Sequence, residues 1–178
     1  RQVHPHIEIK LHTGDPDRAI ARIQEGIEEI TIAAHPDTLS KSLSFKPITQ
    51  TPLVFIAPAQ AQPNLSNSSP QSVEDWQNTP MILSEAGVAR SRVDDWLSEQ
   101  GITPNIYAQV AGNEAIVSMV SLGFGIGVVP KIVLDNSPLV EKIKILDVQP
   151  ALNSYEIGLF TLTRSLKNPL IEAFWELS

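Results

Sequence analysis

Cysteine is absent from the 178 residues, so disulfide bonds, thiolate nucleophiles and cysteine-ligated metals are excluded. Basic residues are also few: 13 Lys and Arg are scattered along the chain against 20 Asp and Glu, which gives a net charge of −7. This balance repels phosphate, so we do not expect the segment to bind DNA itself. No apolar run approaches the roughly 20 residues that a membrane-spanning helix needs. What remains is an ordinary globular composition, long enough for one domain or two small lobes.

The four histidines do not indicate a metal site. His6 and His12 lie on the polar side of an alternating stretch, about 20 Å apart at 3.3 Å per residue, so they cannot share an ion. His4 and His6 are close to the first residue, where a pair of imidazoles is usually only solvated. His35 follows a predicted strand and reads as a loop residue. We therefore predict no metal and no other cofactor.

Catalytic motifs are missing as well. The chain has no G-x-S-x-G nucleophile elbow. The carboxylates of Glu28 and Glu29, and those of Asp94 and Asp95, are sequence neighbours that diverge on a strand or helix and form no obvious acid–base pair. Glu85 is the one carboxylate suited to a ligand, as the acceptor of a hydrogen bond from a hydroxyl. We predict a binding module and not an enzyme.

The first 34 residues follow a strand–helix–strand pattern. Residues 6–13 alternate strictly, which predicts a half-buried strand with Ile7, Ile9, Leu11 and Thr13 on the inner face. A helix is expected from Asp15, its N-cap, to Gly26, and a second strand over residues 28–34. Such a βαβ unit makes its two strands parallel.

The rest of the chain continues as short strands and helices, which predicts an α/β protein. The polar, low-complexity stretch 59–72 reads as an exposed loop. Helices are expected over 88–101, from 113 to 122, and from 169 onward. The expected strands cover residues 43–50, 52–59, 80–84, 105–110, 125–129, 142–148 and 155–163.

Three glycines, Gly123, Gly125 and Gly127, are spaced by single residues. A dinucleotide site needs a strand, then a glycine loop, then a helix, and here the helix comes first. The spacing also differs from G-x-G-x-x-G and from the P-loop. We interpret Gly123 as the left-handed end of the helix, and the other two as points where a neighbouring backbone or ligand comes close.

The same stretch, residues 113–130, resembles the effector domain of LysR-type transcriptional regulators, in which a helix, a glycine run and a proline-closed strand follow one another. Residues 4–33 resemble the first βαβ block of that family, and residues 72–85 the start of its second lobe. The stretches 114–138 and 168–177 resemble especially the members that activate expression of acetohydroxy acid isomeroreductase. In this order the segments cover nearly the whole chain.

The resemblance implies two Rossmann-like lobes joined by two crossing strands, as in type 2 periplasmic binding proteins. Lobe one would comprise residues 1–57 and 158–178, and lobe two residues 58–157. Family members have a strand and a helix ahead of residue 4, and a winged-helix DNA-binding domain before those, so both are expected to be missing here. The resemblance further implies a cytoplasmic homodimer or tetramer, with no membrane contact, that reaches DNA only through the missing domain.

The implied ligand is a small carboxylate metabolite bound between the lobes, 2-acetolactate or 2-aceto-2-hydroxybutyrate, which would regulate genes of branched-chain amino acid biosynthesis. The implied dimer pairs residues 6–12 of one chain with 88–100 and 105–110 of its partner. Two alternatives stay open, a periplasmic solute-binding protein and an enzyme built on the same fold.

Ligands of open α/β lobes bind beyond the carboxyl ends of parallel strands, where helices begin. Three such ends bring backbone N–H groups and small polar side chains, which suit a carboxylate. Local capping would explain any one of them alone, and Asn113 is an expected N-cap. Arg90 is a weaker candidate, because it is also placed to pair with Asp94 on the same helix. The predicted ligand-binding residues are Thr13, Gly14, Ser84, Glu85, Ala86, Gly87, Gly112 and Asn113.

Overall fold

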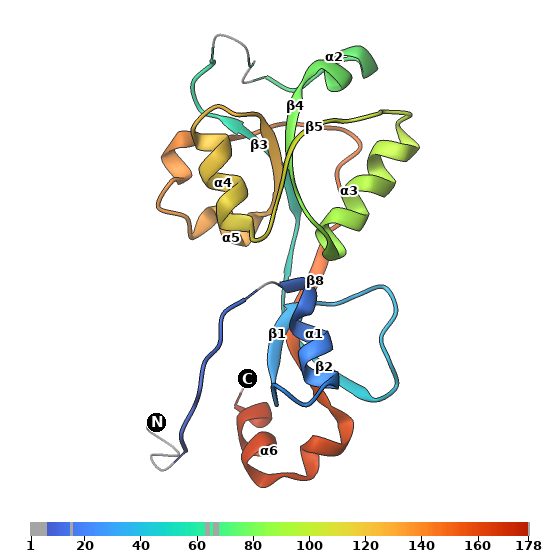
Figure 1. Cartoon of the computed structure of the whole chain (residues 1–178), viewed down its shortest axis with the longest axis vertical. Helices are drawn as coiled ribbons and strands as arrows, with labels where there is room; N and C mark the ends of the chain where they lie inside the picture. The colour runs from blue at the N-terminus through green and yellow to red at the C-terminus, as the bar shows by residue number, and fades with distance from the viewer. Residues whose placement is uncertain (1–6, 15, 63–64, 66–67, 178) are drawn as a thin grey trace. The chain divides into compact units, whose positions relative to one another are not determined.

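The computed structural model describes residues 7–14, 16–62, 65 and 68–177, and it divides the chain into two compact units. Unit 1 comprises residues 1–49 and 156–178, and unit 2 comprises residues 50–155. Each unit contains its own sheet, with three strands in unit 1 and five in unit 2 (Figure 1). Within the described ranges, no helix is long and apolar enough to span a bilayer.

Unit 1 is a small sheet flanked by helices. The strand order is β1-β8-β2, and β1 pairs antiparallel with β8, with Thr31 opposite Phe160. Phe160 is fully buried, and its ring lies 4.7 Å from that of Phe45, which in turn packs edge-on against His35 at 4.5 Å. The elements are α1 (Pro16–Gln24), β1 (Thr31–Ala34), β2 (Leu43–Thr51), β8 (Tyr155–Leu162), the 3-10 helix η2 (Thr163–Lys167) and α6 (Pro169–Glu176).

The prediction of a strand over residues 6–13 is wrong for the part that the structure describes. Residues 7–14 have no regular secondary structure, and the side chains expected to be buried are solvated: Ile9 is 62% exposed and Leu11 82%. A strand exists only when a neighbour accepts its backbone hydrogen bonds. None of the described strands pairs with this stretch, because the order β1-β8-β2 leaves it out. Over the described residues, β1 therefore has no parallel partner in the stretch 7–14, and it pairs with antiparallel β8.

One polar cluster ties residues 7–14 to the rest of unit 1. The Glu28 carboxylate accepts a hydrogen bond from Arg22 Nη2 at 2.5 Å and lies 2.9 Å from His12 Nδ1. The Arg22 hydrogen bond, and after it the one from His12, lowers the pKa of Glu28 below its ordinary value of 4.5. The N-cap that was expected at Asp15 lies outside the described residues, while Gly26 ends the turn after α1 with φ of +73°, as predicted.

Unit 2 is a mixed sheet with the order β5-β4-β6-β3-β7. The pairs β4–β5 and β4–β6 are parallel, whereas β3 runs antiparallel to β6 and β7. The three parallel strands therefore end at the same edge of the sheet. The strands are β3 (Leu53–Pro58), β4 (Pro80–Ser84), β5 (Asn105–Val110), β6 (Ile126–Pro130) and β7 (Ile143–Ile145). The helices are α2 (Val73–Asn78), α3 (Gly87–Glu99), α4 (Asn113–Ser121), α5 (Lys131–Asp135) and the 3-10 helix η1 (Val140–Lys142).

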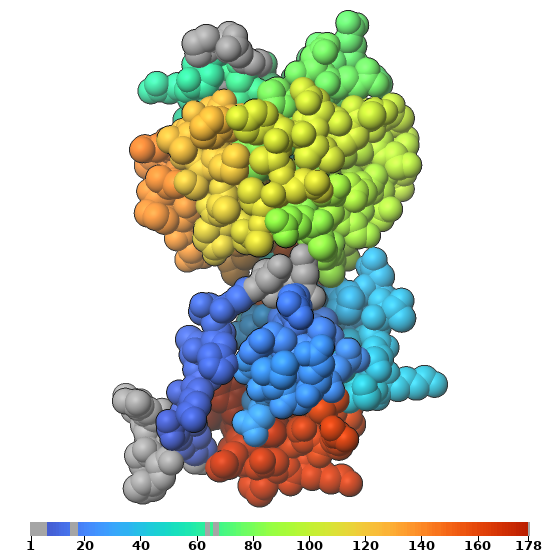
Figure 2. Space-filling model, in the orientation of Figure 1, coloured from blue at the N-terminus to red at the C-terminus, as the bar shows by residue number. Residues whose placement is uncertain are grey.

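Helices cover both faces of this sheet, because successive strand residues point to opposite sides. On one face Ile56 and Ile82 pack with Ile116 and Val120 of α4, all fully buried. On the other face Phe55 meets Trp76 and Trp96 at ring distances of 5.1 Å. Side chains of α3 and α4 form much of the surface of unit 2 on the face shown in Figure 2.

The glycine run that leads from the end of α4 into β6 is structural, as predicted. Gly123 ends α4 with φ of +84°. A Cβ on Gly125 would lie 2.5 Å from the carbonyl oxygen of Pro80, so a neighbouring backbone occupies the space. A Cβ on Gly127 would lie 2.6 Å from Ile116 of α4. These glycines let β6 pack tightly between β4 and the helix layer.

The short α-helices α2 and α5 were not predicted. α2 begins at a capping box, in which the Ser72 hydroxyl accepts from the Asp75 N–H and the Asp75 carboxylate accepts from the backbone N–H of Ser72. The backbone N–H of Gln71, and then the Ser72 hydroxyl, lowers the pKa of Asp75. α5 follows β6 directly after Pro130. With only six and five residues, neither helix has room for the apolar periodicity that identifies a helix in a sequence.

Gly125→Ala should destabilise the protein by about 1–3 kcal/mol, because the backbone carbonyl of Pro80 cannot move aside for the new methyl group. The control is Gly14→Ala, where no atom lies within 4 Å of the added Cβ. Urea unfolding measures both variants. Equal midpoints for the two variants would contradict the close approach of β6 to β4.

Glu28→Gln should remove part of the acid sensitivity of the fold. The pKa of Glu28 is lower in the folded state than its ordinary value of 4.5. The ionised carboxylate therefore adds to the free energy of unfolding at pH values above 4.5, and this contribution is lost as the pH falls through the folded-state pKa. Urea midpoints measured from pH 7 downward should fall less steeply for Glu28→Gln than for the wild type. The control is Glu25→Gln at an exposed position nearby, and parallel profiles for all three proteins would refute the assignment.

Candidate functional site

The candidate site of unit 2 lies where β4 and β5 end and α3 and α4 begin. Ser84 is the last residue of β4, the exposed Glu85 and Ala86 form the link, and Gly87 opens α3 with φ of +93°. After β5, Gly112 has φ of +84° and Asn113 is the first residue of α4. The predicted loops therefore exist at the predicted strand ends.

Backbone pairing holds the two loops side by side. Ser84 lies opposite Val110 in the parallel register of β4 and β5. The N–H of Glu85 donates to the carbonyl oxygen of Val110 at 3.2 Å, which continues that ladder beyond the end of β4. The starts of two helices are thus fixed at one edge of one sheet.

Neither helix start has a side-chain cap within the described chain. The N-cap of α3 is Ala86, which has no side-chain acceptor, and the N-cap of α4 is Gly112. The expectation that Asn113 caps α4 is therefore wrong. Gly112 occupies the N-cap position, and Asn113 is the first helical residue. Backbone N–H groups at the start of a helix attract anions. The first turn of α3 holds no acidic residue, whereas Glu114 stands in the first turn of α4, so α3 provides the more favourable field for an anion.

The guanidinium of Arg90 is hydrogen-bonded to other groups of unit 2. Its Nε lies 2.8 and 2.9 Å from the two carboxylate oxygens of Asp94, which is the pair expected from the spacing. Its Nη1 donates to the carbonyl oxygen of Ser84 at 2.9 Å and to Oε1 of Gln109 at 2.5 Å. One guanidinium thus joins the end of β4, strand β5 and the second turn of α3. We assign Arg90 to the support of the loop and not to ligand contact.

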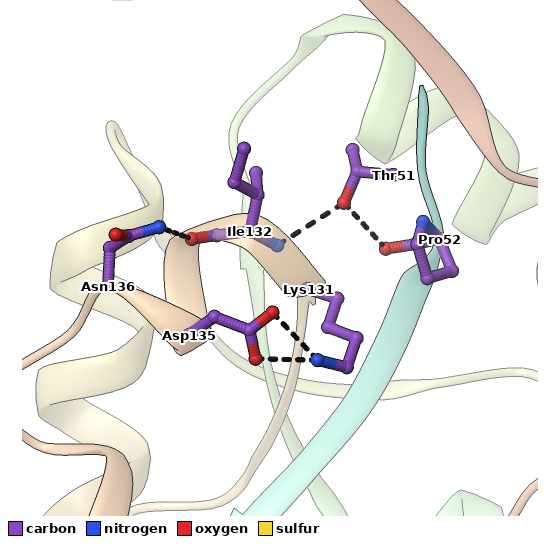
Figure 3. A network of polar contacts seen from close by, with 6 residues as sticks. All are labelled: Thr51, Pro52, Lys131, Ile132, Asp135 and Asn136. Atoms are coloured by element: carbon purple, nitrogen blue, oxygen red, sulfur yellow. Dashed lines mark hydrogen bonds and ion pairs between the residues drawn. The ribbon is translucent and has the colours of Figure 1, made fainter. Parts of the chain in front are cut away.

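The third parallel strand end, after β6, was missed by sequence reasoning. Here the buried hydroxyl of Thr51 accepts from the N–H of Ile132 at 3.2 Å (Figure 3). The N–H of Lys131 donates to the carbonyl oxygen of Pro52 at 2.9 Å. Lys131 pairs with Asp135 one turn on, at 2.6 Å. The backbone N–H groups of Lys131 and Ile132 at the start of α5 therefore have acceptors within the protein. The starts of α3 and α4 have no side-chain cap among the described residues. The Lys131–Asp135 spacing is a sequence signal that could have revealed this helix.

The remaining predicted residues, Thr13 and Gly14, belong to unit 1. Both are exposed and lie in the stretch without regular structure, so Thr13 does not end a buried strand as expected. Of the eight predicted residues, the structure brings together the six of unit 2. Among the described residues, no group of three or more His, Asp or Glu side chains could hold a metal ion. His35 packs against Phe45, and the prediction for His4 and His6 concerns residues outside the described ones.

Comparison with known proteins gives a match over the whole chain. A family model described as the LysR substrate binding domain matches residues 1–178. The chain is 40% identical over 178 residues to the HTH-type transcriptional activator IlvY of Haemophilus influenzae, covering 98% of this chain and 60% of the relative. It is 37% identical to the HTH-type transcriptional regulator IlvY of Escherichia coli K12, covering 99% and 60%. The chain thus spans about 60% of the length of these curated relatives.

Solved structures agree on the fold. The regulatory domain of CcmR from Synechocystis, in complex with 2-PG, superposes with a TM-score of 0.81 at 21% identity, covering 99% of this chain and 84% of that one. The effector binding domain of QuiR in complex with shikimate superposes with a TM-score of 0.79 at 23% identity, covering 98% and 81%. At such identities the likeness establishes the two-sheet architecture, which is that of type 2 periplasmic binding proteins.

Arg90→Met should destabilise the protein by about 1–3 kcal/mol, because it leaves the Ser84 carbonyl and Gln109 without their charged donor. Arg18→Met, at an exposed position of α1, is the matched control and should change stability by less than about 0.5 kcal/mol. Chemical denaturation measures both. A stability equal to that of the control would show that Arg90 does not support the loop.

Proposed function

Because the chain belongs to the LysR family, whose substrate-binding domain it matches throughout, we propose that it senses a small carboxylate metabolite for a transcriptional activator. The observation that carries this proposal is the pair of uncapped helix starts at Ala86 and Gly112, held together by the bond from Glu85 to Val110. These backbone N–H groups suit a carboxylate, and the hydroxyl of Ser84 and the amide of Asn113 add polar groups beside them.

The proposed ligand is 2-acetolactate or 2-aceto-2-hydroxybutyrate. Identities of 37–40% to IlvY activators over nearly the whole chain support this choice within the family. Both molecules are 2-hydroxy acids with a neighbouring ketone. Their carboxylate would face the start of α3, and their hydroxyl would donate to the Glu85 side chain. Thr13 and Gly14 of unit 1 stay predicted contacts.

The proposal extends to the activator as a whole. It would act in the cytoplasm on genes of branched-chain amino acid biosynthesis, bind DNA through a separate winged-helix domain, and assemble as a homodimer or tetramer. The net charge of −7 supports a separate DNA-binding part, because this segment repels phosphate. β5 stands at the edge of its sheet, with Tyr107 57% exposed, and fits the predicted partner contact of residues 105–110. Residues 7–12, the described part of the predicted contact 6–12, have no regular secondary structure in the single chain, and their contact with a partner stays a prediction.

We propose binding without turnover. The named relatives are transcriptional regulators, and they favour this reading over a solute-binding protein or an enzyme. The ligand should be recovered unchanged after incubation with the protein.

Adding 2-acetolactate should raise the melting temperature of the protein, because a ligand that binds only the folded state stabilises it. Acetoin has the same carbon skeleton without the carboxylate, and it should give no shift. Asn113→Ala and Ser84→Ala should each weaken binding about tenfold, the loss of roughly one hydrogen bond to a charged group. Asn105→Ala, at the opposite end of β5, is the control and should bind as the wild type does. Equal shifts with acetoin and acetolactate would contradict recognition of the carboxylate.

A further inference from the structure

The chain passes between the two units twice. One crossing lies in β2, between Thr49 and Gln50, and the other at the start of β8, between Tyr155 and Glu156. The side chain of Gln50 donates from Nε2 to the Ser154 hydroxyl at 2.8 Å, so the two crossing segments are tied together within unit 2. Any change in the orientation of one unit against the other must be absorbed at these two points.

Helix α3 holds the second crossing. Nη1 of Arg92 donates to the carbonyl oxygens of Asn153, at 3.2 Å, and of Ser154. The same guanidinium lies 5.6 Å from the ring centroid of Tyr155, which is buried. One guanidinium therefore contacts three successive residues of the segment that leads into the crossing. A cation over an aromatic face and two charged hydrogen bonds to carbonyls add to one another at this position.

A second side chain of the same helix supports this attachment. Trp96 follows Arg92 by one turn, is buried, and donates from Nε1 to the carbonyl oxygen of Pro150 at 2.7 Å. The segment from Pro150 to Tyr155 is thus fastened to α3 at both ends. The first crossing is fastened to a different helix, because the Thr51 hydroxyl accepts from the N–H of Ile132 in α5 (Figure 3). The carbonyl oxygen of Pro52 also accepts from the N–H of Lys131.

The helix that holds the second crossing is also the helix that begins at the candidate site. α3 starts at Gly87, and Arg92 lies five residues further, about 7.5 Å along the axis at 1.5 Å per residue. A 13-residue helix moves as a rigid element, so a shift of its first turn is carried to Arg92. The start of α3 is uncapped and can respond to an anion, whereas the start of α5 is already satisfied.

We propose that Arg92 is a positioning residue that couples ligand binding at Ser84–Gly87 to the second crossing, and thereby sets the orientation of the two units. The proposal rests on the proposed function only for the effect of the ligand, and the effect of Arg92 without ligand does not depend on it. Arg92 does not contact the ligand in this scheme. It transmits the position of α3 to residues 153–155, and it also restricts the crossing when no ligand is bound.

A purely structural role for Arg92 would lower the stability of unit 2 and nothing else. The coupling role predicts a broader range of orientations between the units. The absence of native cysteine makes this measurable, because Glu25→Cys in unit 1 and Gln77→Cys in unit 2 give two defined, exposed sites for spin labels. Pulsed electron–electron double resonance then reports the distribution of the distance between the two spin labels.

Without ligand, Arg92→Met should broaden that distribution about twofold, because the crossing loses its attachment to α3. Arg92→Lys should give an intermediate width, since an ammonium can bind a carbonyl but cannot bridge two of them and cover the ring as well. The exposed Arg164→Met in η2 is the matched control and should leave the distribution unchanged. Circular dichroism monitors folding, and Arg92→Lys carries the test if Arg92→Met does not fold.

With saturating 2-acetolactate, the wild type should change its mean distance, and Arg92→Met should lose that change while its affinity falls by less than about threefold. Wild-type widths in both Arg92 variants, or an unaltered response to ligand in Arg92→Met, would overturn the coupling. Failure of the wild type to bind 2-acetolactate would reject the proposed ligand instead. The measurement without ligand would still decide the role of Arg92.

Discussion

The parallel pairing of β4 with β5 and β6 is the constraint on which the rest of unit 2 depends. Parallel strands end at one edge, so the helices that follow them must all begin there. Two consequences follow from the same geometry. The links at residues 84–87 and 112–113 lie side by side. The two helices that hold the crossings, α3 and α5, also begin at this edge.

The three helix starts at this edge are chemically different, and the proposed carboxylate site rests on that difference. Thr51 fills the start of α5 with a hydroxyl acceptor, so no external anion is needed there. The start of α4 carries Glu114, which opposes a second negative charge nearby. The start of α3 has an apolar N-cap, no acidic residue in its first turn and no side-chain acceptor for its N–H groups among the described residues. Arg90 and Arg92, both on this helix, bind the sheet and the crossing, and so make its position a property of the whole unit.

Sequence reasoning located most of unit 2 and misjudged the first strand of unit 1. Strands such as β4 and helices such as α3 are encoded locally, by apolar runs and by a glycine such as Gly101 after the helix. Residues 7–13 carry an equally clear alternation, yet no described strand pairs with them. Alternation states which side chains could share a face, but hydrogen bonding to a neighbour decides whether a strand forms. The loops at Ser84 and Asn113 were predictable because strand ends and helix starts are local features. The roles of Thr51 and Arg92 were not, since their partners lie 81 and 62 residues away.

An amide-resolved NMR titration with 2-acetolactate would show whether backbone N–H groups at the start of α3 bind a small carboxylate. The largest saturable shifts are expected at Glu85, Ala86 and Gly87, with smaller ones at Gly112 and Asn113. Amides at the opposite edge of the sheet, such as Asn105, should not move. Saturable shifts confined to other surfaces, with the amides of residues 85–87 unchanged, would show that the carboxylate does not bind at the start of α3.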